Sequence, residues 1–214
     1  MSSFHVHVVG CVDASGAPQG SVSAAAVLGH LTLRCDTLPV VVSASNVVVD
    51  HTKGGRGGFA PAVEDETLAL IAEALRGKPQ NSTPALSAIS PYPLLNTPFD
   101  QAERSLALQV KQGGSGVRYF SILVAADSAS LEYVLHYYQS KRMREETPSS
   151  PVLLVHLSLP EPSRHCRVLQ KFLEGILADE DGTVTAEDYW IDRVDDVSAR
   201  LVQLSGVDVF SVVV

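Results

Sequence analysis

A four-residue pattern that occurs twice is the feature that most constrains the fold of this chain. His30-Leu31-Thr32-Leu33 recurs almost unchanged as His156-Leu157-Ser158-Leu159. Successive side chains of an extended strand point to opposite faces, so each histidine lies on the same face as the hydroxyl two residues later. Each copy therefore predicts a strand that presents an imidazole beside a hydroxyl. Two such strands favour a molecule built from two similar halves.

A single copy is also explained by an ordinary half-buried strand, because apolar and polar residues alternate in any such strand. The pair favours a functional role. Two imidazole and hydroxyl pairs that face one cleft would supply a general base, a general acid and two neutral donors for a phosphate. The pattern therefore predicts a site that cleaves a phosphodiester without a metal.

Composition limits the classes of protein to which the chain can belong. With 214 residues, of which 45% are hydrophobic and 19% charged, it can bury a substantial core as one large or two small globular lobes. A formal charge of -8 argues against sequence-independent nucleic-acid binding, which needs a basic surface, but leaves a small anionic substrate open. Cys11, Cys35 and Cys166 have no metal-ligand spacing and are odd in number, which favours a reducing compartment.

No part of the sequence resembles a targeting or membrane segment. The first residues lack a basic stretch followed by an apolar one, and no apolar run approaches the length of a membrane span. We therefore expect a soluble, cytoplasmic protein that is a monomer and does not bind membranes.

Residues 1–78 form the first of two predicted lobes. Leu68, Ile71, Ala72 and Leu75 share one face of a predicted helix that ends before a glycine. The predicted elements of this lobe are strands Phe4–Cys11, Gly29–Cys35 and Val40–Asp50 and the helix Glu64–Arg76. The next segment, residues 79–104, is rich in proline and predicts a connection between the lobes.

Residues 105–214 form the second predicted lobe, in which strands and helices are more regular. Its predicted elements are strand Ser105–Gln112, strand Val117–Ala126, helix Ser128–Lys141, strand Val152–Leu159, helix Ser163–Ala178, strand Tyr189–Leu204 and strand Val207–Val214. The first lobe repeats this order in a weaker form, which indicates an internal duplication of an α+β lobe. Strands could be exchanged between the lobes, and the duplication would bring both histidine motifs to one central cleft.

The second half also carries a resemblance to a known superfamily. Gly116-Val117-Arg118-Tyr119-Phe120, a following helix and then the His156 motif resemble the two-histidine (2H) phosphoesterase superfamily, and within it the eukaryotic cyclic phosphodiesterases. The resemblance implies an α+β, bilobal 2H phosphoesterase-like fold in which two pseudo-symmetric lobes of antiparallel sheet, flanked by helices, surround a central cleft. The first half departs from the family, because only Gly10 to Gly29 separates its first strand from the motif.

The resemblance also implies an activity that needs no cofactor and no metal. Its substrate would be a small cyclic phosphate, such as a nucleoside 2′,3′-cyclic phosphate or ADP-ribose 1″,2″-cyclic phosphate, or an RNA end. One of His30 and His156 would take a proton from water while the other protonates the leaving oxygen. Thr32 and Ser158 would donate hydrogen bonds to the phosphoryl oxygens.

Four further residues are candidate substrate contacts. In a 2H-like lobe the first strand neighbours the motif strand, which brings His5 and His7 toward the substrate. Tyr119 could stack on a nucleobase. Arg56 belongs to the loop Lys53–Gly58, which lacks the spacing of a nucleotide-binding P-loop but could close over a phosphate.

Two alternatives remain open from the sequence. His5-Val6-His7, with Asp50 and His51, has a spacing that metal sites use, although a solvent-facing or cleft-lining strand edge explains it as well. The second alternative is a non-catalytic nucleotide-binding or scaffold protein that keeps a degenerate 2H fold and has lost turnover.

Overall fold

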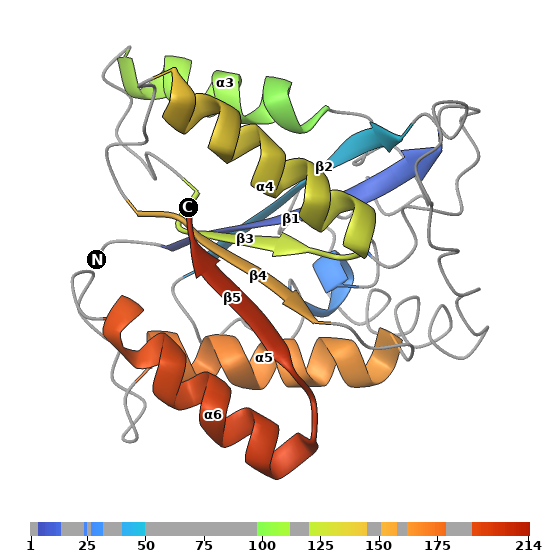
Figure 1. The fold of residues 1–214 in the computed structure, drawn as a ribbon, viewed down its shortest axis with the longest axis vertical. Coiled ribbons are helices and arrows are strands. Elements are labelled where there is room, and N and C mark those ends of the chain that lie inside the picture. The colour runs from blue at the N-terminus through green and yellow to red at the C-terminus, as the bar shows by residue number, and fades with distance from the viewer. Residues whose placement is uncertain are drawn as a thin grey trace, which may run out of the picture.

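A computed structural model gives the fold of the chain (Figure 1). The residues that it describes are 4–13, 24, 27–31, 40–49, 98–111, 120–144, 151–157, 162–178 and 190–214. Several predicted features lie outside them, including the helix Glu64–Arg76 and most of the proline-rich connection.

The described strands form one five-stranded sheet in the order β2-β1-β3-β4-β5. These strands are β1 (Phe4–Asp13), β2 (Val40–Val49), β3 (Ile122–Ala125), β4 (Leu153–Leu157) and β5 (Val209–Val213). Neighbouring strands are parallel except for β5, which runs antiparallel to β4. Because β1 lies between β2 and β3, strands from both predicted lobes share this sheet.

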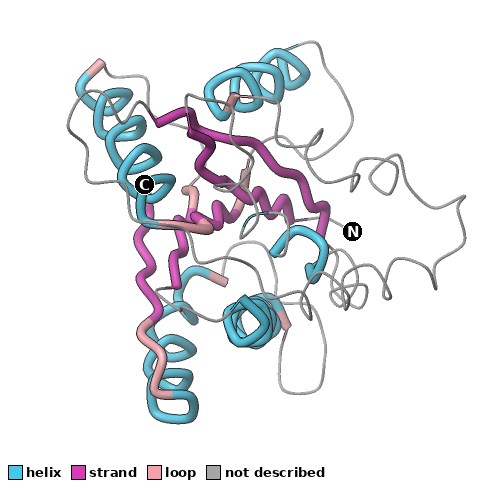
Figure 2. Tube along the Cα trace, turned by 90° about the vertical axis from the view of Figure 1, so that its right-hand side faces the viewer, coloured by secondary structure: helices cyan, strands magenta, loops and turns pink. Residues whose placement is uncertain are grey.

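Helices cover both faces of the sheet (Figure 1), and a view from the side shows the strands between them (Figure 2). One face carries α3 (Phe99–Lys111) and α4 (Ser128–Met143), and the other carries the helical residues 27–31, α5 (Pro162–Leu177) and α6 (Val194–Ser205), which the short 3-10 helix η4 (Ile191–Arg193) precedes. No helix in the described ranges is long and apolar enough to span a membrane.

The two faces carry separate apolar cores, and side-chain alternation along each strand divides the residues between them. From β1, Val6 and Val8 join the core beneath α5 and α6, whereas Val9 joins the core beneath α3 and α4. Every residue of β3 and β4 is buried. This explains their continuous apolar sequence, because a parallel strand with helices on both sides has no solvent face.

The chain is an α+β protein, as the sequence predicts, with a mixed sheet flanked by helices. The described strands show one sheet with a single antiparallel pair, and not the two antiparallel sheets that the resemblance implies. Individual predictions are confirmed for six elements: β1, β2, β4, β5, α4 and α5 begin or end within a few residues of the predicted bounds. The predicted strand Val117–Ala126 is present in part, as β3.

Two predicted strands are helices. Residues 105–111 of the first fall in α3, which is rich in good helix formers such as Ala, Leu and Glu and is anchored by the buried Phe99. Residues 191–204 of the second fall in η4 and α6, where Val194 and Leu201 are buried two helical turns apart. In the first segment Leu106, Leu108 and Val110 alternate as in a strand, but the residues around them form a helix.

The predicted motif strand Gly29–Cys35 is also wrong over the residues that the structure describes. Residues 27–31 are helical, and Val27, Leu28 and Leu31 are buried. Positions i, i+1 and i+4 share one face of a helix, so these side chains can enter the core together only in that conformation. His30 therefore belongs to a helical turn, whereas His156 belongs to a strand, although the two motifs have nearly the same letters.

Candidate functional site

The structure does not bring His30 and His156 together. The helical residues 27–31 pack into the core on the α5 face, where His30 Nε2 donates a hydrogen bond to Gln170 Oε1 at 2.8 Å. On β4, Val155 and Leu157 point into that same core, and side-chain alternation therefore directs His156 to the α3 and α4 face. The two imidazoles thus lie on opposite faces of the sheet.

Of the eight residues that the sequence nominates for the site, four lie outside the described residues, namely Thr32, Arg56, Tyr119 and Ser158. The other four are histidines with three different surroundings. His30 contacts α5, His156 lies at the end of β4, and His5 and His7 lie in the first half of β1.

His156 is held in one tautomer at the carboxyl end of β4. Its Nδ1 donates to the backbone oxygen of Ala125 on β3 at 2.9 Å, and its side chain is buried. A carbonyl oxygen accepts only, so Nδ1 carries the proton and the neutral ring has its lone pair on Nε2. This arrangement resembles the orientation of a catalytic or ligand-binding histidine, in which one nitrogen is fixed and the other is left for chemistry.

His156 lies beside the topological switch point of the sheet. After β1 the chain passes to the helical residues 27–31 on one face, and after β3 it passes to α4 on the other face, while β1 and β3 are parallel neighbours. Connections that leave adjacent strands toward opposite faces open a crevice outside the strand ends. In open α/β sheets, ligands bind at this place. We call the ends of β1, β3 and β4 the carboxyl edge.

Asp127 bridges the carboxyl edge from β3 to β1. One carboxylate oxygen accepts a hydrogen bond from the backbone N–H of Cys11 at 2.9 Å, and the other accepts from the N–H of Ser130 at 2.7 Å. The second bond belongs to a capping box at the start of α4. Burial raises the pKa of Asp127, while its hydrogen bonds to Ser130 and Cys11 and the nearby His156 oppose that rise.

The sequence around Asp127 has the pattern of a helix cap. Asp127 follows the apolar strand and precedes the α4 helix, with Ser130 three residues later, and this is the pattern of a capped helix. Its second role, contact with β1, has no signal in the local sequence. That contact depends on β1 and β3 being neighbours, which only the topology establishes.

His5 and His7 form a buried network with two serines of β2. Ser43 Oγ lies 2.5 Å from His5 Nε2 and 2.6 Å from His7 Nδ1, and Ser45 Oγ lies 2.7 Å from His7 Nε2. The His7 ring stacks on the ring of Phe120, with centroids 4.1 Å apart. His7 is only 1% exposed and His5 is 8% exposed, so both imidazoles are buried, as is His156, which is also 8% exposed.

Burial keeps both imidazoles of this network neutral. It lowers the pKa of His5 to about 4, and for His7 burial and the adjacent His5 charge lower the pKa to about 3. Neutral imidazoles can bind metals, but among the described residues no group of three or more His, Cys, Asp or Glu could hold an ion. Asp50 and His51, the further ligands considered from the sequence, lie outside the described ranges.

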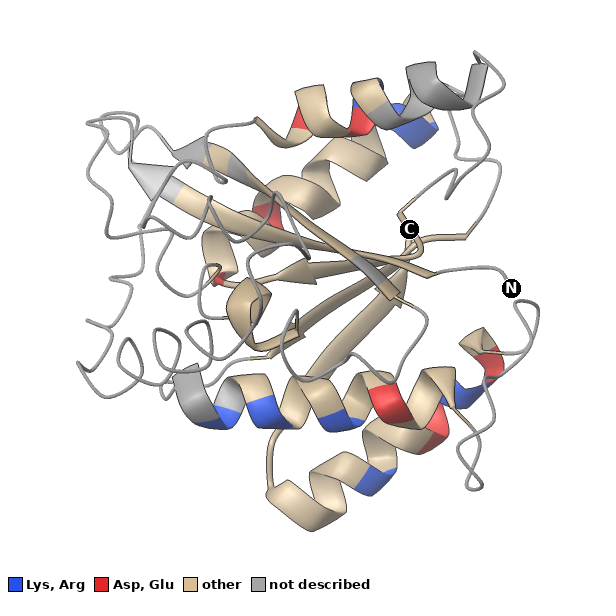
Figure 3. Ribbon diagram, turned by 180° about the vertical axis from the view of Figure 1, so that it is seen from behind, with Lys and Arg blue, Asp and Glu red and all other residues tan. Residues whose placement is uncertain are grey.

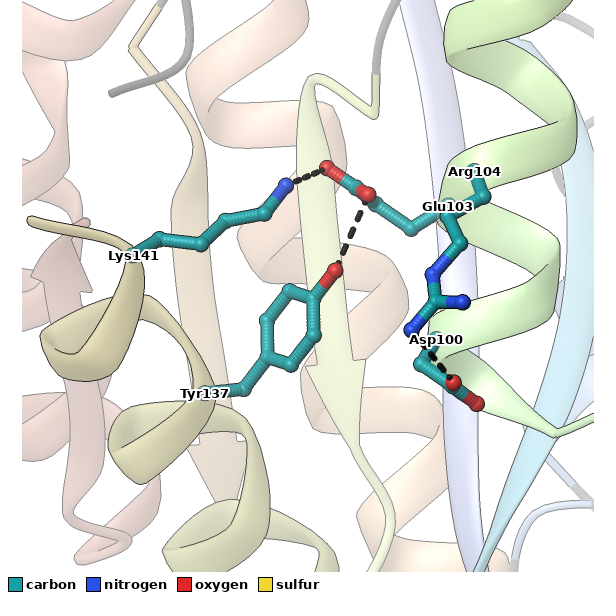
Figure 4. Close-up of polar contacts among 5 residues, drawn as sticks. All are labelled: Asp100, Glu103, Arg104, Tyr137 and Lys141. Atoms are coloured by element: carbon teal, nitrogen blue, oxygen red, sulfur yellow. Dashed lines mark hydrogen bonds and ion pairs between the residues drawn. The ribbon is translucent and has the colours of Figure 1, made fainter. Parts of the chain in front are cut away.

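A second polar cluster joins α3 to α4 (Figure 4). Glu103 accepts hydrogen bonds from Tyr137 Oη at 3.0 Å and from Lys141 Nζ at 2.5 Å, and the Lys141 nitrogen lies 5.1 Å from the centre of the Tyr137 ring. Burial and the Glu103 carboxylate raise the pKa of Tyr137. Arg104 and Asp100 form an ion pair one turn apart on α3. A protonated tyrosine and a paired lysine tie two helices together and supply no nucleophile.

Comparison of the chain with protein-family models, with curated proteins and with solved structures found no match in any of the three. The geometry thus makes the carboxyl edge the candidate site. His156 is its candidate ligand-binding side chain, and Asp127 links β3 to β1 there.

Proposed function

We propose that this protein binds a nucleotide or another small phosphorylated ligand at the carboxyl edge and does not hydrolyse it. The observation that carries this proposal is the separation of His30 and His156 by the sheet. It corresponds to the alternative that the sequence left open, a non-catalytic nucleotide-binding or scaffold protein.

The separation removes one partner from the predicted acid and base pair. Hydrolysis by this mechanism needs two imidazoles within hydrogen-bond reach of one phosphate. His30 already donates from Nε2 to Gln170 on the far face, and His7, which shares the face of His156, is buried in the first half of β1. Neither His30 nor His7 is therefore placed to share a phosphate with His156.

Binding makes smaller demands on the carboxyl edge than catalysis does. A ligand phosphate is held by donors, and His156 becomes a donor at Nε2 when it is protonated. The start of α4 is not available for this purpose, because Asp127 caps it with its own carboxylate. We infer that the phosphate lies nearer to β4 than to α4, beside His156.

The test measures binding and turnover on the same preparation. The purified protein is titrated by calorimetry with 2′,3′-cyclic nucleotides, ADP-ribose 1″,2″-cyclic phosphate and the corresponding linear phosphates, and each mixture is then analysed for product by chromatography. We expect binding without product. His156→Ala should weaken binding about tenfold or more, and the matched His30→Ala variant should leave it unchanged. Absence of binding by every ligand would reject the proposal.

Cyclic phosphodiesterase activity of the bilobal 2H type is the second candidate, and the fixed tautomer of His156 favours it. A histidine with one nitrogen bonded to a carbonyl and a lone pair on the other is suited to act as a general base. Hydrolysis that is lost in both His156→Ala and His30→Ala would establish the paired mechanism. Hydrolysis lost only in His156→Ala would assign the activity to this histidine with a different second group.

We also propose that the protein acts in the cytoplasm. Cys166 is a free cysteine, as a reducing compartment favours. Burial raises the pKa of Cys166 to about 12, so this thiol stays protonated and unreactive. Fractionation of cells that contain the tagged protein would test the assignment.

A further inference from the structure

Phe210 lies directly opposite His156 on the neighbouring strand. The two residues are partners in the antiparallel pair of β4 and β5, and Figure 1 shows the end of β4 beside the start of β5. Directly opposed residues of an antiparallel pair point to the same face of the sheet, with Cβ atoms about 5 Å apart. Phe210 therefore lies beside the carboxyl edge, next to the histidine that we assign to ligand binding.

Packing along β5 gives the same face for Phe210. Val212 and Val214 pack against the core beneath α3 and α4, whereas Val209 packs against the core on the α5 face. Side chains alternate along a strand, so Phe210 shares the face of Val212. This is also the face of His156, so strand pairing and packing agree.

Phe210 and His156 differ in their access to solvent. Phe210 is 43% exposed, whereas His156 is 8% exposed. Among the described residues no aromatic ring packs on Phe210, although Tyr133, which is also exposed, packs edge-on against Phe99. The pair therefore places an accessible apolar ring beside a more deeply set imidazole.

The two strands that carry this pair contain no charged residue (Figure 3). They offer a ligand an aromatic ring and aliphatic side chains, but no partner for a second ionic group. A single exposed apolar side chain is common on protein surfaces and by itself indicates no ligand. The position of Phe210 beside the imidazole distinguishes it from the other exposed apolar residues.

We propose that Phe210 stacks on the base of a nucleotide whose phosphate binds at His156. This inference rests on the binding function proposed above, and it narrows the ligand from small phosphorylated molecules to nucleotides. A nucleotide carries its base and its phosphate on one ribose, so adjacent residues can contact both. Every base presents a π-face to an aromatic ring, so we expect little selectivity among the bases.

The test compares AMP with ribose 5-phosphate, which has the same ribose and phosphate but no base, by calorimetric titration of the full chain. We expect AMP to bind about tenfold more tightly. Phe210→Ala should remove this advantage and leave the affinity for ribose 5-phosphate unchanged, whereas Phe210→Tyr should retain it. His156→Ala should weaken the binding of both ligands.

Val213→Ala is the matched control. Val213 lies on the same strand and is 42% exposed, but it points to the opposite face, so the change should leave both affinities unchanged. Phe210→Leu, which keeps an apolar side chain but has no ring, repeats the test if Phe210→Ala prevents folding.

The outcomes separate this inference from the function on which it rests. If neither ligand binds, both are rejected. If AMP binds and Phe210→Ala leaves its affinity unchanged, or weakens both ligands equally, only the role of Phe210 is overturned. Sedimentation of the same variants tests a contact between two copies of the chain, and a dimer that Phe210→Ala dissociates without a change in AMP affinity would also overturn it.

Discussion

Two groups of histidines lie on the same face of the sheet but have different surroundings. His5 and His7, in the first half of β1, are enclosed by serines of β2 and by aromatic rings, and every described contact of theirs is within the core. His156, at the end of β4, has its Nδ1 bonded to the backbone oxygen of Ala125 on β3. His5 and His156 are equally buried, each 8% exposed, so the two groups differ in their partners and in their position along the strand.

The largest effect that we expect from this difference is a loss of stability in acid. Unfolding exposes His5 and His7, whose pKa values then return to about 6.5, whereas burial holds them at about 4 and about 3 in the folded state. Between pH 6.5 and about 4 the unfolded state binds more protons, so the free energy of unfolding falls as the pH falls. Each pKa unit corresponds to about 1.4 kcal/mol, which predicts a loss of several kcal/mol over this window.

Urea unfolding at a series of pH values between 7 and 4 measures this loss. Asp127 acts in the opposite sense, because burial raises its pKa and protonation in acid then favours the folded state. The double variant His5→Gln with His7→Gln removes both titrating groups and should show a flatter pH dependence. An equal slope in the double variant would mean that the network does not control stability in acid.

The next largest effect should follow from His7→Ala. This change removes a fully buried ring that stacks on Phe120, and it leaves the hydroxyl of Ser45 without its described partner. Loss of a buried ring together with an unsatisfied polar group predicts a free energy of unfolding lower by about 3 kcal/mol. Urea unfolding at pH 7 measures it, and a decrease below about 1 kcal/mol would show that the network is not part of the core.

Asp127→Ala should have an intermediate effect. The variant loses the N-cap of α4 and leaves the buried N–H of Cys11 without its acceptor. Loss of a cap costs about 1 kcal/mol and an unsatisfied buried donor about as much again, so we expect a decrease of about 2 kcal/mol in the free energy of unfolding. Asp127→Asn is the matched control, because its amide oxygen can still accept one of the two bonds, and its decrease should be about half as large.

The sequence predicted those parts of the fold in which local pattern and burial agree. The apolar run Leu153–Leu157 is a strand because helices cover both of its faces, and α4 begins at the cap that Asp127 supplies. The prediction is wrong where the same sequence pattern fits both the period of a helix and the period of a strand. Leu31 is part of a helix because Val27, four residues earlier, enters the same core, whereas Leu157, in the same motif, is part of a strand.

The candidate site could be predicted only in part for a related reason. His156 and its strand are evident from the sequence, but the face to which a residue points depends on which strands are neighbours and on which side each connection crosses. The Cys11 and Asp127 contact joins residues more than a hundred positions apart, and His30 is on the wrong face because β1 leads to a helix on the α5 side. The order of the strands and the sides of their connections determine these contacts, and the spacing of residues along the sequence does not reveal them.

The smallest effect on stability should come from His156→Ala, although this histidine is the one that we assign to ligand binding. The change removes a single hydrogen bond, from Nδ1 to the Ala125 oxygen, and a side chain that lies at the end of the sheet. We expect a decrease of about 1 kcal/mol in the free energy of unfolding, compared with about 3 kcal/mol for His7→Ala.

Ligand affinity should change in the opposite order, falling about tenfold for His156→Ala and remaining unchanged for any His7 variant that folds. Measurement of both quantities on both variants separates the two histidine groups, and a His156→Ala protein that is strongly destabilised would place His156 with the core, as His7 is. Such a result would leave the carboxyl edge without the side chain on which the proposed binding depends.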